Sequence, residues 1–600
     1  MESINNNSKA AFSYLPKPPQ SISEHAPTGV SGGREISVSE SSESPLLNLP
    51  RLTQLNIIGH LGLKDVACLK QVSSHFQELI KQEDIPAKAW YRRFSSAHQS
   101  LLKTAITARS DEQLSAWLGQ FTNNQALIKS LVKSREEVRP ALLFFNNADL
   151  MSQCETFNVD KKVTISHGDL INSATFSKDG LHVVTASNDG KVKIYDKEDD
   201  GSWKKKATIS HDEEVNSASF SADGHHVVTI GEDNKVKICS RNDDGLWEEK
   251  TTITHDRFVE SATFSADSRY LVTASDDGTA KIYGYEDDGS WKAKGTIFHD
   301  EGVNTATFSA DSSHLVTASD DHTVKIYSKV GDGLWVEKAT IEHDDTVSSA
   351  TFSADSRYLV TASEDCTAKI YGQEEGGTWE EKAKIYHVDY VDSATFSADS
   401  SHLVTVNNCT VKIYGHEDDG PWKEKTIILH KEEVNSATFS DDGSHLVTAS
   451  IDGKAKIYAQ EYGEWKKQTT IHHEDEVYSA NFSADGRYMV TASGDGKVKI
   501  YGHDDDGLWR EIAIFSHNGE VFSATFGPDG RHVVTASGDL TSKIIGLVAD
   551  GSWVEKATIS HGRKVKSATF SADCGHVLTI SDGYDSGYHK VKITELRMNN

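Results

Sequence analysis

The sequence has no run of apolar residues long enough to cross a membrane, and it has no excess of positive charge. A membrane-spanning helix needs about 20 consecutive apolar residues. Lys and Arg number 62 against 90 Asp and Glu, which gives a net charge of −28. Binding to nucleic acid or to anionic lipid requires a basic surface. We therefore expect neither nucleic acid nor a membrane as a partner.

Cysteine is scarce as well, and the usual motifs of catalysis and metal binding are missing. The six cysteines are scattered without a C-x-x-C pair, which argues against zinc or a disulfide framework and indicates a reducing compartment. No nucleophile elbow, Gly-rich phosphate loop or HExxH motif occurs. The first residues lack the basic start and apolar core of a secretory signal. These absences predict a non-enzymatic cytoplasmic protein without cofactor or metal.

Composition divides the chain into four parts. Residues 1–44 are rich in Ser, Asn, Pro and Gly, and we predict that they are disordered because they cannot bury enough apolar surface to offset the entropy of ordering. Residues 45–95 place apolar side chains at helical spacing, and residues 96–155 continue as an amphipathic helical linker. Residues 156–600 consist of repeats.

The repeats are ten copies of one motif, with a step of 44 residues that is shortened to 43 twice. Each copy holds three short β-branched runs and a fourth run that follows an acidic turn and a Trp. A period in the low forties with four strands is typical of a β-propeller blade. The copies begin at His167, His211, His255, His299, His343, His387, His430, His473, His517 and His561.

The two ends of the repeat array predict how the propeller closes. A lone outer strand, KKVTIS at 161–166, precedes the first copy, and the last copy ends with HKVKIT at 589–594 and lacks an outer strand. Pairing these segments would complete the last blade and remove the exposed edges. We expect one ring of ten blades. Ten exceeds the usual number, so two five-bladed rings remain an alternative.

Polar residues recur at fixed positions in each copy, and in this respect the copies resemble the WD-repeat family. That family places a His before the first strand, a Ser or Thr in the second, an Asp in the next turn and a Trp six residues later. His167, Ser187, Asp189 and Tyr195 match these positions, with Tyr in place of Trp. The resemblance implies a buried hydrogen-bond network in each blade rather than a metal or catalytic site. Asn408 stands where the sixth copy should have Asp.

The segment ahead of the repeats resembles an F-box. The order and spacing of its Leu-Pro pair, helical apolar residues, Asp-Val and Val-Ser pairs agree with that family. The resemblance implies binding to a Skp-type adaptor and, through it, to a cullin ubiquitin ligase. Any small helical hairpin is the alternative. The residues that would contact the adaptor or support the contact are Leu49, Pro50, Ile58, Leu61, Asp65, Val66, Val72 and Phe76.

The loop after each recurring His varies from copy to copy, whereas the strands barely change. Carboxylates dominate these loops, with aromatic and basic exceptions. Such a rim would suit a basic protein partner; neutral drift of exposed loops is the alternative. The exceptions, which we predict to form a substrate-binding rim, are Arg257, Phe258, Tyr390, Tyr478, Phe522, Arg563 and Lys564.

Together these patterns predict a multidomain α plus all-β protein, with a helical F-box-like domain ahead of a WD-type β-propeller. An F-box before a propeller is the layout of a ubiquitin-ligase substrate receptor, which recognises a protein substrate with its propeller. The alternative is a WD-repeat scaffold without a ligase role, and a propeller hydrolase or lectin is the least favoured class. F-boxes occur in eukaryotes and in bacteria that inject proteins into eukaryotic hosts, so delivery into a host cell is a second route to the cytoplasm.

Overall fold

The structure is a computed structural model that describes residues 90–107, 109–118, 129, 132, 148, 151–160, 162–331, 333–417, 420–503, 507–582 and 589–598. Helices α6 (Ser96–Thr107) and α7 (Asp111–Leu118) precede the strands. The tail and the F-box-like segment as far as residue 89 lie outside the described residues. Among the helices that the structure describes, none is long and apolar enough to cross a membrane.

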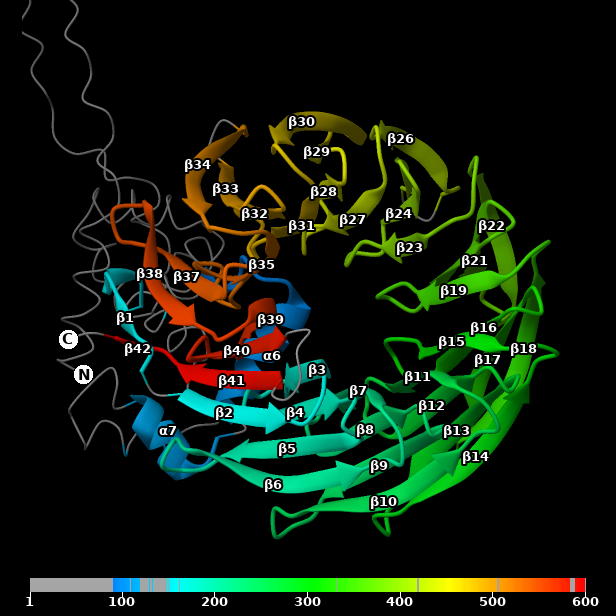
Figure 1. Ribbon diagram of the computed structural model, residues 1–600. Helices are drawn as coiled ribbons and strands as arrows, with labels where there is room; N and C mark the ends of the chain where they lie inside the picture. The colour runs from blue at the N-terminus through cyan, green and yellow to red at the C-terminus, as the bar shows by residue number, and fades with distance from the viewer. Residues whose placement is uncertain are drawn as a thin grey trace, which may run out of the picture.

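Ten four-stranded antiparallel sheets stand side by side in one ring (Figure 1). In each sheet the first strand lies nearest the axis of the ring and the fourth strand lies at the outer edge (Figure 1). We number these sheets as blades 1 to 10. A short pair, β1 (Phe157–Asn158) with β42 (Arg597–Met598), lies outside the ten sheets.

Blades 1 to 5 follow the chain in order, each built from four consecutive strands. Their strands are β3 (Ile171–Phe176), β4 (His182–Ser187), β5 (Lys191–Lys197) and β6 (Trp203–Ser210); β7 (Val215–Phe220), β8 (His226–Gly231), β9 (Lys235–Arg241) and β10 (Trp247–Thr254); β11 (Val259–Phe264), β12 (Tyr270–Ser275), β13 (Thr279–Tyr285) and β14 (Trp291–Phe298); β15 (Val303–Phe308), β16 (His314–Ser319), β17 (Thr323–Val330) and β18 (Leu334–Glu342); and β19 (Val347–Phe352), β20 (Tyr358–Ser363), β21 (Thr367–Gln373) and β22 (Trp379–Tyr386).

Blades 6 to 9 repeat this pattern, and blade 10 takes its outer strand from the start of the array. Their strands are β23 (Ser393–Phe396), β24 (His402–Asn407), β25 (Thr410–Gly415) and β26 (Lys423–Leu429); β27 (Val434–Phe439), β28 (His445–Ser450), β29 (Lys454–Glu461) and β30 (Glu464–His472); β31 (Val477–Phe482), β32 (Tyr488–Ser493), β33 (Lys497–His503) and β34 (Trp509–Ser516); β35 (Val521–Phe526), β36 (His532–Ser537), β37 (Thr541–Leu547) and β38 (Trp553–Ser560); and β39 (Lys564–Phe570), β40 (His576–Asp582), β41 (His589–Glu595) and β2 (Lys162–His167).

The ring closes as the sequence predicts. Strand β2 pairs with β41 from Lys162 opposite Thr594 to His167 opposite His589. Each blade contacts the next one around the circle, and β3 of blade 1 contacts β40 and β41 of blade 10. The prediction of a single ten-bladed ring is therefore confirmed, and the alternative of two five-bladed rings is wrong.

The burial pattern explains why each copy forms these strands. In β4 every side chain is buried, because the second strand lies in the middle of the sheet and neighbouring blades cover both faces. In β17 buried and half-exposed side chains alternate, as expected for a strand nearer the edge. Val184 and Ile194 of blade 1 pack against Val215 and Val227 of blade 2, so β-branched side chains fill the space between blades.

The recurring Trp at the start of each fourth strand joins neighbouring blades. Trp247 of blade 2 is buried, and its ring lies edge-on to His182 of blade 1 at 5.8 Å between centroids. It also contacts Phe220 of its own blade at 5.9 Å. The recurring Trp residues therefore pack between adjacent blades.

One end of the ring, which we call the helix face, carries the helical segment. The turns at this end of each blade join the first strand to the second strand and the third strand to the fourth. The Arg93 guanidinium lies 3.8 Å from the carboxylate of Asp485 in blade 8, and a ring nitrogen of His98 lies 2.7 Å from the Pro528 carbonyl of blade 9. Arg109 forms a buried ion pair with Asp573 of blade 10. The described helices therefore pack on the propeller itself.

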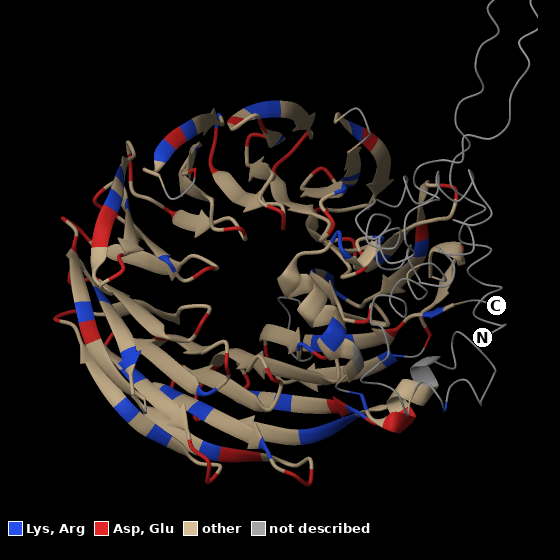
Figure 2. Cartoon of the chain, turned by 180° about the vertical axis from the view of Figure 1, so that it is seen from behind, with Lys and Arg blue, Asp and Glu red and all other residues tan. Residues whose placement is uncertain are grey.

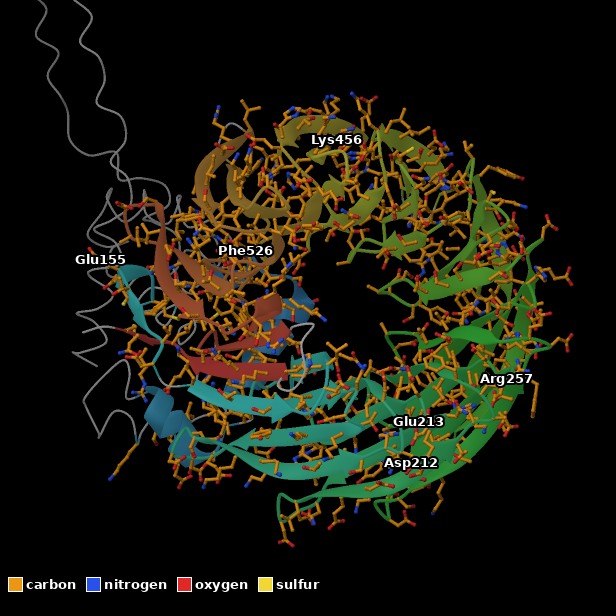
Figure 3. The ribbon with its side chains drawn as sticks, in the orientation of Figure 1. Glu155, Asp212, Glu213, Arg257, Lys456 and Phe526 are labelled. Atoms are coloured by element: carbon orange, nitrogen blue, oxygen red, sulfur yellow. The ribbon has the colours of Figure 1, made fainter. Side chains whose placement is uncertain are left out.

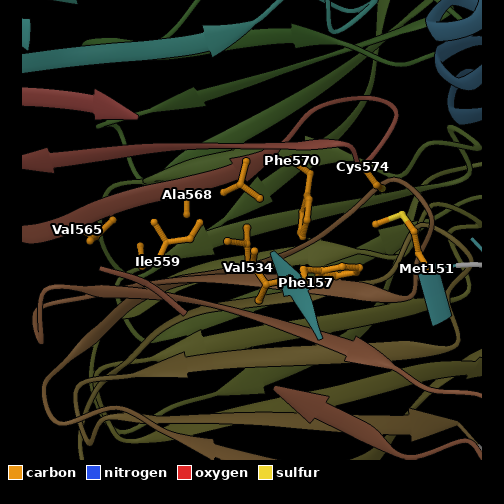
Figure 4. Close-up of a cluster of buried hydrophobic side chains, with 11 residues drawn as sticks. Met151, Phe157, Val534, Ile559, Val565, Ala568, Phe570 and Cys574 are labelled. Carbon is orange, nitrogen blue, oxygen red and sulfur yellow. The ribbon is translucent and has the colours of Figure 1, made fainter. Parts of the chain in front are cut away.

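The residues just before β2 are attached to blades 9 and 10. Met151 and Phe157 pack against Val534, Phe570 and Cys574 in one apolar cluster (Figure 4).

A buried lysine of blade 9 adds a polar contact to the same segment. The Lys556 ammonium donates to the carbonyls of Met151 at 2.5 Å and of Cys154 at 2.8 Å. In blades 1, 3, 5 and 6 the lysine at this strand position pairs with a Glu of the preceding turn, as Lys425 does with Glu417 at 2.9 Å. In blade 9 that Glu is replaced by Val548, so Lys556 is available to the helical segment.

Candidate protein-interaction surface

The other end of the ring, which we call the His face, carries the loops that begin at the ten recurring His residues and the turns between second and third strands. In the third copy, His255 lies with Nδ1 2.9 Å from the Asp277 carboxylate and Nε2 2.8 Å from the Thr273 hydroxyl. The Asp277 carboxylate also accepts the N–H groups of Asp256 and Thr279. One carboxylate thus ties the loop, the turn and the second strand together.

Eight copies have this His–Asp–Thr network, and its hydroxyl member differs from the prediction. The partner of the His is the Thr two residues before the predicted Ser. Ser275 instead donates to the Phe258 carbonyl at 2.7 Å and accepts the N–H of Asp277. The networks begin at His167, His211, His255, His299, His343, His430, His473 and His517.

The predicted Tyr member is also wrong. The Tyr327 hydroxyl donates to the Glu337 carboxylate of the neighbouring fourth strand at 2.9 Å, and Tyr501 reaches Glu511 in the same way at 3.2 Å. The phenol is half-buried and extends across the sheet toward the outer strand, away from the Thr. A Trp at this position would have had only an indole N–H to donate.

The environment of the third copy favours a neutral His255 and an ionised Asp277. Burial lowers the pKa of His255, although Asp277 opposes the shift. Burial alone would raise the pKa of Asp277, but hydrogen bonds from Thr279, from the N–H of Asp256 and from His255 outweigh it and lower the pKa to about 2. Within the described residues, no group of three or more His, Cys, Asp or Glu is placed to hold a metal ion. The role of the network is structural.

Copies six and ten lack the network. In copy six the turn is one residue shorter, so no Asp faces His387: Nε2 contacts Thr405 at 2.9 Å, and Nδ1 has no partner among the described residues. In copy ten neither ring nitrogen of His561 has a partner in the described part of the chain. The last copy also carries an insertion, SDGYDSGYHK at 581–590, of which residues 583–588 lie outside the described residues.

The predicted substrate-binding rim lies on the His face but does not form one cluster. Arg257 and Tyr390 are exposed and lie in blades 3 and 6 (Figure 3 labels Arg257 with Asp212 and Glu213 of blade 2). Phe258 is half-buried beside Arg257, and Arg563 directly precedes Lys564.

Three members of the predicted rim meet on adjacent blades 8, 9 and 10. The rings of Tyr478 and Phe522 are 6.0 Å apart at their centroids, and the Lys564 ammonium lies 6.0 Å from the Phe522 ring.

A group of carboxylates on blades 1 to 4 was missed by the sequence interpretation. Burial raises the pKa of Glu260, and its neighbours Asp276 and Asp320 raise it further. Glu214 has a raised pKa from burial and from Glu232 and Asp169. Asp and Glu also occupy many of the turns that protrude from the ring (Figure 2). Part of this group could have been found in the sequence. Glu260 follows Val259, the first residue of β11, at a position where several other copies have Asn.

Two families match the chain. The F-box domain family matches residues 46–88, so the side chains predicted to contact an adaptor, from Leu49 to Phe76, lie outside the described residues. The WD domain, G-beta repeat family matches eight segments that together span half of the chain. These segments are residues 160–196, 203–240, 247–284, 291–328, 335–372, 422–459, 465–502 and 509–545.

The eight matched segments omit the copies that contain His387 and His561, the two without a network. A comparison with curated proteins gave no match. Among solved structures, Saccharomyces cerevisiae Sqt1 is similar at 15% identity and a TM-score of 0.41, covering 60% of this chain and 99% of that chain. F-box domains bind Skp1-type adaptors and WD propellers bind protein partners, so the combination is that of a protein-interaction scaffold. The chain belongs to the WD40-repeat family and carries an F-box domain ahead of a ten-bladed propeller.

Proposed function

We propose that this protein is a substrate receptor of a Skp/cullin-type ubiquitin ligase, in which the F-box binds the adaptor and the propeller binds a protein substrate. The F-box match at residues 46–88 carries this proposal, because it supplies a recruiting module beside a binding module. Both families act by binding, so the proposal assigns no enzymatic step to this chain. The cytoplasm is the location that this role requires, reached directly or by delivery into a host cell.

The attachment of the helical segment supports a division of labour between the two ends of the ring. The F-box match ends two residues before Trp90, which is buried in a cluster with Phe94, Leu102 and Ala572 of blade 10. The chain therefore leaves the F-box on the helix face. The loops of the His face lie at the opposite end of every blade and stay available to a substrate.

The contacts of this segment also anchor the chain that follows the F-box match to the propeller. Arg109 and Asp573 are both buried, and the ammonium of Lys556 is bound by backbone carbonyls at the end of the segment. Breaking a buried ion pair by removing one partner costs about 3–5 kcal/mol. We infer that this segment stays attached to the propeller when a substrate binds.

Titration of a purified Skp-type adaptor onto the full chain tests the proposal. We expect binding at tens of micromolar or tighter, on the order of −6 kcal/mol. Replacing Leu49 and Pro50 with Ala should weaken it at least about tenfold, because hot-spot side chains contribute roughly 2 kcal/mol or more. Another Leu-Pro pair, Leu15 and Pro16, lies outside the F-box match and provides a matched control. The variant in which both residues are replaced with Ala should bind the adaptor as tightly as wild type. Absence of adaptor binding by the wild-type chain would favour a scaffold without a ligase role.

A further inference from the structure

At one position of the His face, blades 8 and 9 carry an aromatic residue, whereas the other eight blades carry a polar or charged one. It is the residue that follows the strand-opening Val or Ile of each first strand. This residue is Asn in blades 1, 2, 4 and 7, and in blades 1, 4 and 7 its amide donates to the carbonyl of the next blade's opening Val. Asn172 reaches Val215 at 2.9 Å and Asn304 reaches Val347 at 3.1 Å. The Asn side chain therefore joins adjacent blades.

Blades 8 and 9 carry Tyr478 and Phe522 at this position. An aromatic ring has no amide with which to make the interblade hydrogen bond. Asn304 of blade 4 also donates to Asp320 of the adjacent turn at 2.8 Å, whereas the turn residues beside the two aromatic rings are Gly494 and Gly538. A Cβ atom on Gly538 would lie 3.6 Å from the Phe522 ring. With glycine at both turn positions no side chain stands beside the rings, and the exchange replaces a scaffold contact with partly exposed aromatic surface.

Carboxylates surround this aromatic pair. Burial raises the pKa of Tyr478, and Glu520, Glu476 and Asp475 each raise it further, so all three lie close enough to act on the phenol. Glu520 is exposed and Glu476 is half-buried. An aromatic ring has a negative face that attracts cations, and the Lys564 ammonium already lies 6.0 Å from the Phe522 centroid. Rings and carboxylates together favour a cationic ligand and disfavour a phosphorylated or acidic one.

We propose that Asp475, Glu476, Tyr478, Glu520 and Phe522 form a binding site for an arginine-containing basic segment of a protein partner. This inference rests on the proposed function in one respect, since the partner would be the substrate. A guanidinium group stacks on aromatic rings and pairs with carboxylates in a fork geometry, so arginine satisfies both halves of the site. The net charge of −28 favours approach of a basic segment over an acidic one.

The test measures binding of labelled synthetic peptides to the full chain by fluorescence anisotropy at physiological salt, without adaptor. The probe is a peptide of four Arg-Gly-Ser triplets, compared with peptides in which Gln or Glu replaces each Arg. We expect the Arg peptide to bind at least about tenfold more tightly than the Gln peptide, a difference of about 1.4 kcal/mol, and the Glu peptide to show no binding. Equal binding of the Arg and Gln peptides would overturn the proposal.

The variant Y478N/F522N separates this site from general attraction to an acidic protein. It installs the Asn of blades 1, 4 and 7, so the ring should fold and keep its carboxylates. We expect the Arg peptide to bind this variant at least about tenfold more weakly. The matched control Y462N/F298N exchanges the same residue types at exposed positions elsewhere and should bind as wild type. Wild-type affinity in Y478N/F522N would overturn the proposal.

The two proposals fail separately. Adaptor affinity should be unchanged in Y478N/F522N, because both residues lie on the His face, whereas the segment that follows the F-box match packs on the helix face. If the protein binds the Arg peptide but no adaptor, the proposed ligase role is wrong and the proposed arginine site stands. If it binds the adaptor but not the Arg peptide, the proposed arginine site is wrong and the ligase role stands.

Discussion

Eight copies have a complete His–Asp–Thr network and two do not, yet all ten form four-stranded blades. The network is therefore not what makes a copy fold. Ladder hydrogen bonds and the apolar layers between blades suffice, since Val404 and Ile413 of blade 6 are as buried as Val184 and Ile194 of blade 1. What the sixth blade loses is local. Its first strand, β23, has four residues, whereas the other first strands have six or seven.

The comparison shows that the network stabilises the loops of the His face rather than the sheets. Asp277 fixes the backbone of both the loop and the turn that meet there. In the sixth copy the N–H of Asn408 turns to the Asp392 side chain instead, and Tyr390 in the loop is 49% exposed. A blade without the network keeps its place in the ring while its loop takes a different course.

The largest expected effect comes from the tenth blade, which lacks the network and is assembled from both ends of the array. Deleting residues 157–166 removes β2 and with it Ile165, a fully buried member of the cluster with Ile171 and Val591. Loss of one such side chain costs about 2–5 kcal/mol, and β41 becomes an unpaired edge that can recruit other chains. We expect a lower thermal midpoint and aggregation, measured by calorimetry and size-exclusion chromatography.

A truncation of residues 2–40, in the tail predicted to be disordered, serves as control for this deletion and should change neither measurement. If the deletion of residues 157–166 also left the thermal midpoint and the aggregation state unchanged, the closure of the ring through β2 would not stabilise the protein.

The next largest effect compares Asp277 with Asn408. Asp277→Ala leaves His255, Thr279 and the loop N–H of Asp256 without their shared acceptor, and each buried group left unpaired costs about 1–3 kcal/mol. Asn408→Gly removes an exposed side chain from a copy that already lacks the network, and glycine tolerates the left-handed backbone there (φ 43°), so its cost should stay within about 0.5 kcal/mol. Urea denaturation midpoints of the two variants give the comparison. Equal losses at both positions would mean that the networks do not stabilise the protein.

Replacing the His itself gives a smaller and opposite pair of effects. His255→Phe removes the imidazole hydrogen bond from the Asp277 carboxylate, which keeps its bonds from Asp256 and Thr279, and it takes the imidazole partner from the buried Thr273 hydroxyl. The loss should cost about 1–3 kcal/mol. His561→Phe removes two buried ring nitrogens that have no partner among the described residues. That exchange should therefore be neutral or stabilising within about 0.5 kcal/mol. A loss at His561 as large as that at His255 would show that an unseen partner holds it.

Periodicity predicts the ten four-stranded units, because a step of 43 or 44 residues repeats one unit. The unpaired strands at the two ends of the array predict the closure, whereas the spacing leaves two five-bladed rings as an alternative to one ring. The hydroxyl partner of His was not predictable with the same accuracy. Thr185 and Ser187 lie two residues apart on one strand, and both are fully buried. Only the reach of the imidazole from its loop selects Thr185.

The site residues were harder to predict than the ring, because contact between blades does not appear in the spacing of one copy. Tyr478 and Phe522 were singled out as exceptions to an acidic rim. Their proximity across two blades, and the glycines that lie beside them, became visible only when the copies were arranged in a ring.

The smallest effect is a difference in acid sensitivity between the two kinds of copy. Burial lowers the pKa of His561 in the folded protein to about 3, whereas the pKa of an unfolded His is near 6.5. As the pH falls, the unfolded chain therefore binds a proton before the folded protein does. The free energy of unfolding decreases as the pH drops below about 6.5. His561→Phe removes this contribution and should retain about 1 kcal/mol more stability than wild type on going from pH 7 to 5.5.

The Asp277 carboxylate behaves differently. Its pKa of about 2 lies below the unfolded value near 4, so its contribution is complete above pH 4 and is lost only as the pH falls toward 2. Asp277→Asn should therefore change the stability by the same amount at pH 7 and at pH 5.5, which parallel denaturation curves at the two pH values would measure. A pH-dependent difference for Asp277→Asn in this window, or none for His561→Phe, would contradict the assignment of neutral His and ionised Asp to these copies.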